Sequence, residues 1–231
     1  MAAITTQQCF SDDWRRTDPD LVVYLPKEPP YYGEASDHFL VDHTPGGDLL
    51  AIFSTCTQPH GADYSVVFTR SKDGGVNWSP LGLIDGPTER PGQTSEFGFP
   101  VMSRSGRIYC FYYRSAGFGD SLINARLRCK YSDDDGYTWT GSTVNLPMRR
   151  SKYDHPDPAV PPHALVWQKP IRDSKGRVIV GVTRGTSTYL RPRLEMTVGG
   201  REFRCEFVRF DNIDEGPDPE DVKLTWLQDD D

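Results

Sequence analysis

Short apolar runs separated by clusters of Gly, Pro, Asp and Asn dominate this chain. Runs of four to eight residues with such boundaries are typical of β-strands joined by turns. Three runs share one pattern, in which a Gly and a polar residue precede an apolar stretch. They cover residues 47–53 (GDLLAIF), 106–112 (GRIYCFY) and 176–182 (GRVIVGV). Each follows another apolar run and a turn, so the pattern predicts three β-hairpins.

Two further strands are predicted after each hairpin. The third strands are YSVVFTR, ARLRCKY and FRCEFVRF, and the fourth strands are LGLID, STVNLP and VKLTWL. The equivalent glycines Gly47, Gly106 and Gly176 lie 59 and then 70 positions apart. Four strands per repeat at this spacing are typical of β-propeller blades. We therefore predict an all-β fold. Its parts are an N-terminal extension (1–35) and a partial propeller (36–231) with blades at about 36–88, 89–150 and 151–228.

The stretch SKDGGVNW (71–78) returns in looser form as SDDDGYTW (132–139), each time where a third strand ends. In such a turn an Asp side chain accepts hydrogen bonds from backbone amides, and a Gly adopts positive φ. The Trp is expected to bury its ring against the blade. We thus predict structural roles for Asp73 and Asp134, and a degraded turn of the same kind at 211–216.

These two motifs resemble the Asp-box, or bacterial neuraminidase repeat, and residues 36–228 resemble sialidase-like β-propellers. The resemblance implies blades around an axis, usually six in sialidases, so three blades would form half of a ring. Asp-boxes also occur in other glycosidases, in polysaccharide lyases and in binding proteins. Three blades leave open sheet faces. We expect these to be covered by the rest of a longer propeller, by a second copy in a homo-oligomer, or by a second chain.

Charge and composition narrow the range of partners. The formal net charge of −7 leaves no general basic surface for a phosphate backbone, so nucleic acid is not expected. The five Cys match no zinc spacing, and we expect buried free thiols.

The N-terminus lacks a secretory pattern and no apolar stretch approaches 18 residues, so no membrane partner is expected. The chain as written is predicted to be cytoplasmic, or secreted or periplasmic if a signal has been removed. Neither a cofactor nor a metal ion is expected.

The topology gathers candidate chemistry at one end of the blades. Loops before first strands and loops between second and third strands share the end opposite the Asp-boxes. Loops on a rigid scaffold commonly carry function. Titratable residues at this end include His38, His60, Asp63, Glu96, Tyr113, Arg114, His163 and Arg184. Each alone would also fit an ordinary turn or surface role, and their gathering at one end is what indicates a site.

Sialidase chemistry requires an arginine cluster, an Asp acid and a Tyr nucleophile activated by a Glu. By resemblance Asp63 is the candidate general acid, with a turn role as an equal alternative. Arg114 and Arg184 end second strands at equivalent positions, and we expect them to share a substrate carboxylate, which suits the planar guanidinium. However, the stretch SDHFLV (36–41) lacks the first-blade Arg of sialidases, which argues against true sialidase chemistry.

A polysaccharide lyase is the second hypothesis. Such enzymes use a Tyr or His to remove the proton beside a uronate carboxylate, which an Arg or His neutralises. His60, Tyr113 and Arg114 would supply this set. A non-catalytic glycan-binding propeller is the third hypothesis. We favour a glycoside hydrolase acting on an acidic or decorated sugar. Its predicted catalytic residues are Asp63, His60 and Tyr113, and its predicted substrate contacts are Arg114, Arg184, His38, Glu96 and His163.

Overall fold

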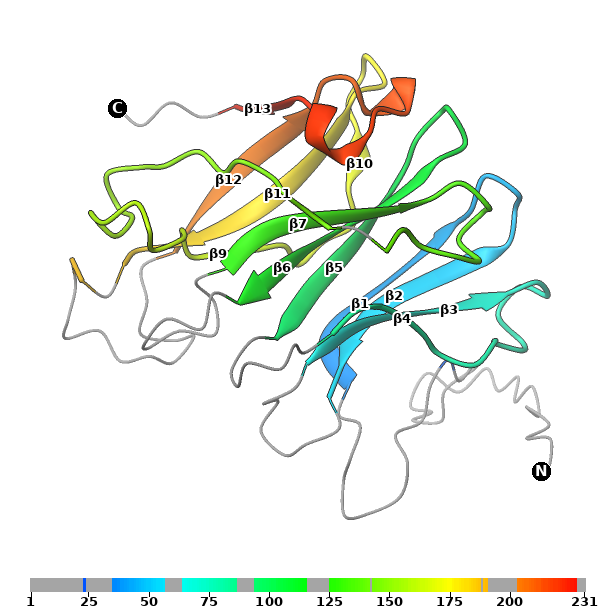
Figure 1. The fold of residues 1–231 in the computed structure, drawn as a ribbon. Helices are drawn as coiled ribbons and strands as arrows, with labels where there is room; N and C mark the ends of the chain where they lie inside the picture. Colours follow the sequence, from blue (N-terminus) through cyan, green and yellow to red (C-terminus); the bar gives the residue numbers. More distant parts are fainter. Residues whose placement is uncertain are drawn as a thin grey trace, which may run out of the picture.

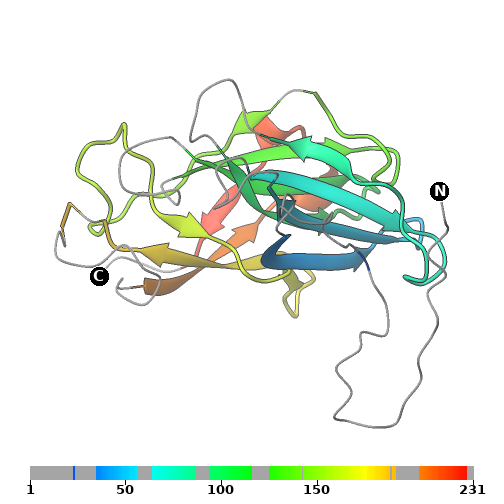
Figure 2. The ribbon, with the colours of Figure 1, turned by 90° about the horizontal axis from the view of Figure 1, so that it is seen from below.

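The computed structural model is built from three antiparallel β-sheets that stand side by side (Figures 1 and 2). It describes residues 23, 35–56, 64–86, 94–115, 125–141, 143–187, 189–190 and 203–227. Within these ranges there is no α-helix, and the only helical segments are two short 3-10 turns. The predicted all-β fold is therefore confirmed.

Sheets 1 and 2 have the same simple order, in which each strand pairs with the next along the chain. Sheet 1 contains β1 (Ala35–His43), β2 (Leu49–Thr55), β3 (Ser65–Ser71) and β4 (Gly82–Asp85). Sheet 2 contains β5 (Ser95–Met102), β6 (Ile108–Ser115), β7 (Ala125–Ser132) and β8 (Val144–Asn145). This meander is the arrangement predicted for propeller blades.

Sheet 3 repeats that order, but its first strand is divided in two. Its strands are β9 (Ala164–Leu165), β10 (Ile171–Arg172), β11 (Val178–Gly185), β12 (Phe203–Phe210) and β13 (Leu224–Trp226). Both β9 and β10 pair with β11, at opposite ends of it. Pro170, immediately before β10, has no amide hydrogen to give to a ladder, which is consistent with the break in pairing.

The three predicted hairpins share one turn geometry. Gly47, Gly106 and Gly176 have φ of 94°, 94° and 79°, and each donates its amide hydrogen to the carbonyl three residues earlier. A left-handed backbone at this position favours glycine because it has no Cβ. The recurring glycine in the sequence therefore marks the turn between the first and second strands, which we call the 1→2 turn.

The first of the two motifs that resemble an Asp-box, residues 71–78, forms the turn between β3 and β4, the 3→4 turn of sheet 1. We call residues 71–78 and 132–139 the first and second Asp-box after this resemblance. The Asp73 carboxylate accepts hydrogen bonds from the Asn77 amide (2.8 Å) and the Asn77 side chain (2.7 Å). The Ser71 hydroxyl accepts one from the Gly75 amide (2.8 Å), and the Trp78 indole donates to the Gly75 carbonyl (2.8 Å). The bonds from Asn77 hold the pKa of Asp73 below its usual range.

The second Asp-box repeats these bonds between β7 and β8. Asp134 accepts from the Thr138 amide (2.8 Å) and hydroxyl (2.6 Å), and Ser132 accepts from the Gly136 amide (2.8 Å). The Trp139 ring packs on Phe68 of sheet 1, with 5.8 Å between ring centroids. The turn-forming roles predicted for Asp73 and Asp134 are confirmed. In sheet 3 the corresponding turn contains η3 (Ile213–Glu215) and η4 (Pro219–Asp221) instead of a full box.

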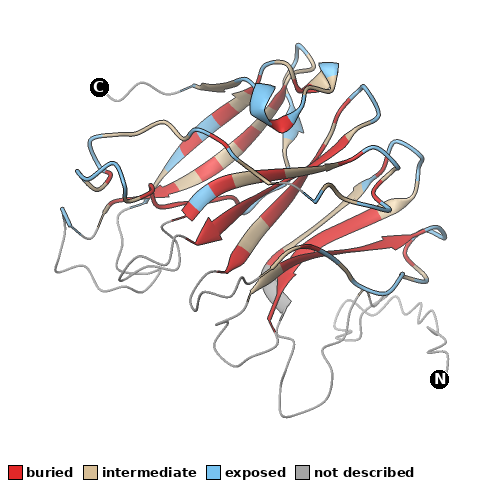
Figure 3. Cartoon of the chain, viewed as in Figure 1, coloured by how far each residue is buried: buried red, intermediate tan, exposed pale blue. Residues whose placement is uncertain are grey.

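Two apolar cores lie between the sheets. Sheets 1 and 2 enclose the smaller one, and sheets 2 and 3 enclose the larger. Alternate residues of β6 enter opposite cores, because successive side chains of a strand point to opposite faces. Figure 3 shows the middle sheet buried along most of its length. We call the side of a sheet that looks toward the next sheet in chain order its forward face.

Candidate functional site

The three first strands meet at Phe97, near the start of β5. Its ring lies edge-on to His38 in β1, with 5.8 Å between centroids, and edge-on to Trp167, two residues after β9, at 5.5 Å. One aromatic side chain therefore links all three sheets. Trp167 is exposed, so this junction reaches the surface. We call Glu96, Phe97, His38 and Trp167 the front junction.

A β-bulge places Phe97 at this point. Glu96 pairs with Tyr113 and Phe99 pairs with Phe111, which leaves one extra residue on the β5 side. Phe97 has φ of 56°, a left-handed backbone that costs a residue with a Cβ about 1–3 kcal/mol. The Phe97 amide donates a hydrogen bond to the Ser54 hydroxyl of sheet 1 at 3.2 Å. Bulges of this kind often redirect side chains beside functional sites.

Glu96, which precedes the strained residue, has a carboxyl group with a raised pKa. Burial raises its pKa to about 7, although the Thr94 hydroxyl, which donates a hydrogen bond to it at 2.5 Å, lowers the pKa. A carboxyl group with a pKa near 7 can hold a proton at neutral pH and deliver it to a leaving group. The chemistry available at the front junction is therefore that of a general acid.

Tyr113 lies directly opposite Glu96 in the β5–β6 ladder, but it belongs to the core. It is almost fully buried, and burial raises its pKa, with the positive charge of Arg184 acting in the opposite direction. The structure thus brings three predicted site residues into one neighbourhood, Glu96, Tyr113 and Arg184. The depth of Tyr113 suits packing between sheets 2 and 3 more than attack on a substrate.

Arg184 is fully buried and already holds a carboxylate of its own chain. Its Nη2 lies 3.0 and 2.9 Å from the two oxygens of Asp154, and its guanidinium lies over the Trp226 ring. The same Nη2 also donates to the carbonyl of Arg149 at 3.2 Å. Asp154 and Arg149 belong to the segment that joins sheet 2 to sheet 3, so Arg184 ties its own sheet to that connection.

Arg114 makes an equivalent connection between sheets 1 and 2. Its Nη1 donates to the Ser95 hydroxyl (2.8 Å) and to the Gly86 carbonyl, at the end of sheet 1. Burial lowers its pKa, and Asp85 at 3.9 Å acts to raise it. Arg114 and Arg184 therefore lie at different seams, a term we use for the boundary between two neighbouring sheets. The structure does not bring them together on one carboxylate, because each is buried in contacts of its own seam.

The predicted histidines have separate positions. His38 is buried at the front junction, and His163 is buried at the start of sheet 3, where its ring packs 5.8 Å from that of Phe203. His60 and Asp63 lie outside the described residues, so their catalytic roles stay predictions. Within the described ranges no group of three His, Cys, Asp or Glu side chains could hold a metal ion.

Sequence reasoning missed Phe97 and Trp167. Trp167 lies in the apolar run HALVW (163–167) that opens the third repeat, which was an available signal for a side chain near the axis. Phe97 gave no such signal, because its position depends on a bulge that shifts the register by one residue. The aromatic part of the front junction was therefore visible only in the folded chain.

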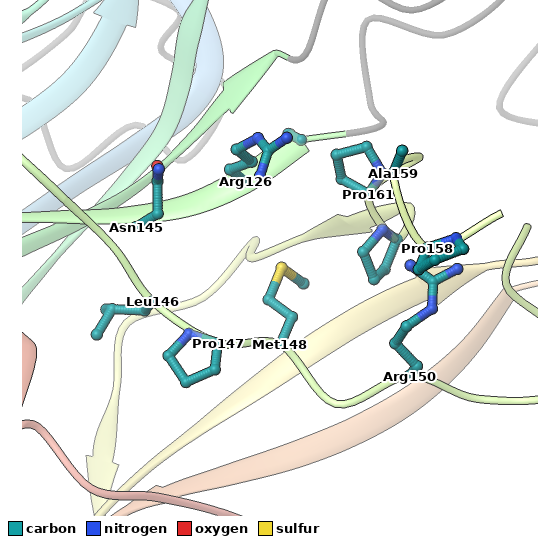
Figure 4. A pocket seen from close by; sticks show the side chains of 11 residues that line it. Arg126, Asn145, Leu146, Pro147, Met148, Arg150, Pro158, Ala159 and Pro161 are labelled. Atoms are coloured by element: carbon teal, nitrogen blue, oxygen red, sulfur yellow. The ribbon is translucent and has the colours of Figure 1, made fainter.

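Two of the cavities lined by described residues lie away from the front junction. One of about 220 Å³ is enclosed by the beginning of β7, by β8 and by the proline-rich segment after it (Figure 4). Met148 lies in its middle, and the Arg150 side chain beside it bonds the carbonyl of Val160. The other, of about 350 Å³, lies near the ends of β1 and β5, where Lys169 forms an ion pair with Asp42 at 2.7 Å.

Comparison with known proteins supports the fold. No protein-family model matches the chain, and no curated protein sequence matches it significantly. A crystal structure of a protein of unknown function from Dyadobacter fermentans is similar, with 16% identity and a TM-score of 0.58, covering 89% of this chain and 56% of that one.

Two glycoside-acting proteins have similar folds. An endo-arabinase from Bacteroides thetaiotaomicron is 12% identical (TM-score 0.50, 88% of this chain and 66% of that one). A thermostable family-43 glycoside hydrolase is 11% identical (TM-score 0.50, 84% and 58%). At these identities the likeness concerns the fold, that of a partial β-propeller. The chain spans between half and two thirds of the length of these three structures. None of the described helical segments has the length and apolarity of a membrane-spanning helix.

Proposed function

We propose that this chain is part of a carbohydrate-active β-propeller that hydrolyses a glycosidic bond, with Glu96 as the proton donor. The observation that carries the proposal is the burial of the Glu96 carboxyl group beside Phe97, at the point where the first strands converge, which raises its pKa to about 7. A general acid of a glycosidase needs such a raised pKa to remain protonated near neutral pH.

The aromatic side chains beside Glu96 support a sugar as the ligand. Trp167 is exposed and packs against Phe97, which fixes its ring. Binding sites are commonly lined by aromatic side chains with a few polar groups that set orientation. The similar folds of the endo-arabinase and of the family-43 hydrolase agree with this reading. An acidic or decorated sugar, as in sialidase-like proteins, is our proposed substrate class, with Asp63 as a second carboxyl group.

The lyase alternative with Tyr113 as the base is weaker because Tyr113 and Arg114 are divided, whereas His60, the other candidate base, lies outside the described residues. Tyr113 and Arg114 are consecutive in β6, so their side chains point to opposite faces of sheet 2. Tyr113 enters the core shared with sheet 3, whereas Arg114 contacts the end of sheet 1. A base and a carboxylate-neutralising group must act on adjacent atoms of one substrate. This pair does not have that geometry.

Removal of the Glu96 proton tests the proposed hydrolase. In the Glu96→Gln protein we expect kcat/KM for an unactivated glycoside to fall by about 10²–10⁴-fold, the usual contribution of a general acid. Dinitrophenyl glycosides, whose leaving group needs no proton, should lose far less. In the unchanged protein, kcat/KM on the unactivated substrate should fall as the pH rises through about 7.

The matched control is Thr94→Val, which removes the hydrogen bond to Glu96 but leaves its carboxyl group in place. It should retain activity and shift the upper limb of the pH profile to higher pH, since that bond lowers the pKa. Equal losses on both substrate classes in Glu96→Gln would contradict the acid role. A product that absorbs in the ultraviolet through a new double bond would identify a lyase.

A further inference from the structure

The two inter-sheet contacts of this chain follow one design. In both, the forward face of a sheet is covered by the sheet that comes next in chain order. In both, the 3→4 turn of the later sheet reaches back to the 1→2 turn of the earlier one. Sheet 3 has the same strand order, so each position on its forward face has an equivalent on the first two.

Apolar positions that are buried on sheets 1 and 2 are exposed on sheet 3. One position of the third strand is equivalent in all three sheets, because it pairs with the seventh residue after the turn glycine. It is Val66 in β3, Leu127 in β7 and Cys205 in β12. Val66 is 0% and Leu127 is 5% exposed, whereas Cys205 is exposed. Two residues further along β12, on the same face, Phe207 is 43% exposed. Figure 3 shows the resulting alternation of buried and exposed residues along β12.

A carboxylate completes each of the two existing contacts. Asp135 of sheet 2 accepts hydrogen bonds from the Gly46 amide (2.8 Å) and the Thr44 hydroxyl (2.8 Å) in the 1→2 turn of sheet 1. Asp214 of sheet 3 accepts one from the Arg104 amide (3.0 Å) in the 1→2 turn of sheet 2. A sheet docked on sheet 3 would be expected to offer the same group to the turn at 173–177.

We propose that the forward face of sheet 3 is the docking surface for a further four-stranded sheet of the same repeat, joined to this polypeptide after β13. Its apolar face would cover Cys205 and Phe207, and a carboxylate in its 3→4 turn would contact the turn at 173–177. The cis connection follows from chain order, because both observed forward faces are covered by the next sheet along the chain. The greater length of the three similar structures agrees with it.

A second copy of this chain fits the surface less well. If sheet 1 of a second copy docked on sheet 3, the face of sheet 1 opposite its own forward face would have to be exposed. Ala51 and Phe53, which point to that face, are each 0% exposed. Head-to-tail docking of a second copy would therefore need a face that is already buried.

The exposed thiol of Cys205 provides a direct test. The native product of the complete reading frame is treated with a maleimide, residues 1–231 are treated in parallel, and the Cys205 peptide is quantified by mass spectrometry. We expect alkylation of Cys205 to be about 100-fold slower or more in the complete protein, because access would then require local opening. Cys110, which is 0% exposed in this chain, is the slow reference.

Equal rates for Cys205 in the two proteins would overturn the proposal. So would concentration-dependent protection of residues 1–231 together with a doubled mass, which would assign the face to a second copy.

A matched pair of substitutions gives an independent measurement in the complete protein. Phe207→Lys should lower its unfolding midpoint by roughly 5 °C or more, whereas Leu83→Lys, at a 64% exposed position of sheet 1, should not. Equal midpoints would again contradict the proposal.

Discussion

At the scale of single residues, the front junction combines two local costs, a left-handed Phe97 and a buried Glu96 carboxyl group. A non-glycine residue at positive φ persists only where its surroundings determine its position. Here the aromatic contacts of Phe97 with His38 and Trp167, and its bond to Ser54, hold it in place. Glu96 is affected in a related way, because burial makes its charged form unfavourable. Such costs are retained where a site needs its geometry and protonation state.

The pKa of Glu96 gives a prediction about stability. A carboxyl group whose pKa rises from 4.5 to about 7 on folding stabilises the folded chain below pH 4.5, and loses this contribution as the pH rises through 7. The loss amounts to about 3 kcal/mol at 1.4 kcal/mol per pH unit. Denaturant unfolding between pH 5 and 8 should show this decline in the unchanged protein and much less of it in Glu96→Gln. Parallel curves for the two proteins would exclude the raised pKa.

At the scale of elements, the two Asp-boxes have different tasks at one position. Gly74 in the first box and Asp135 in the second have φ of 71° and 62°, so both adopt the same left-handed turn. Asp135 accepts this backbone because its carboxylate reaches sheet 1, where it bonds Gly46 and forms an ion pair with the buried Arg70 at 2.9 Å. Sheet 1 has no preceding sheet among the described residues, and its box carries Gly there. The repeated motif therefore builds a turn, and the variable position within it joins neighbouring sheets.

Conversion of the second box into the first should weaken the contact between sheets. Asp135→Gly relieves the backbone strain but removes the hydrogen bonds to sheet 1 and leaves Arg70 with Asp48 alone. We expect a net loss of about 2 kcal/mol in the free energy of unfolding, since hydrogen bonds to charged groups contribute roughly 1.5–3 kcal/mol each and the relieved strain offsets part of the loss. Asp135→Asn, which keeps an acceptor for Gly46, should lose less. Chemical denaturation measures both, and an unchanged midpoint for Asp135→Gly would contradict the inter-sheet role.

At the scale of the whole molecule, the middle sheet determines how the chain holds together. It supplies fully buried side chains to both cores, whereas the fully buried core residues of sheets 1 and 3 each belong to a single core. Sheets 1 and 3 are also connected directly by the Lys169–Asp42 ion pair, and Phe97 of the middle sheet contacts an aromatic ring on each side, His38 and Trp167. Because the sheets share cores, we expect them to unfold together and not one after another.

A core substitution in the middle sheet tests this cooperativity. Phe111 is 0% exposed and packs against Phe99 and Phe210, with ring centroids 5.6 and 4.8 Å away. Phe111→Ala should cost about 3–5 kcal/mol through lost contacts and a cavity. Calorimetry should show one transition at a lower midpoint, while Tyr189→Ala, at an exposed position, should not shift it. Two separate transitions in the unchanged protein would contradict cooperative unfolding of the three sheets.

The sequence by itself determined the strands, the hairpins and the Asp-box turns, because these depend on local patterns. The turn glycines need positive φ, and the Ser, Asp and Gly of each box bond within a few residues of one another. The end of the sheets that gathers titratable residues also followed from strand order. Glu96, Tyr113 and Arg184 were all recognised as candidates, and they do lie in one neighbourhood.

Only the tertiary structure decided which candidates are available for chemistry. Arg114 and Arg184 occupy equivalent positions in the sequence, but packing buries each of them at its own seam, where carbonyl and carboxylate oxygens of the chain take up the guanidinium. The raised pKa of Glu96 arises from burial, and the position of Phe97 arises from a one-residue bulge at the point where three sheets meet. Burial and register between distant segments are set by how whole sheets pack, and no local pattern of residues encodes them.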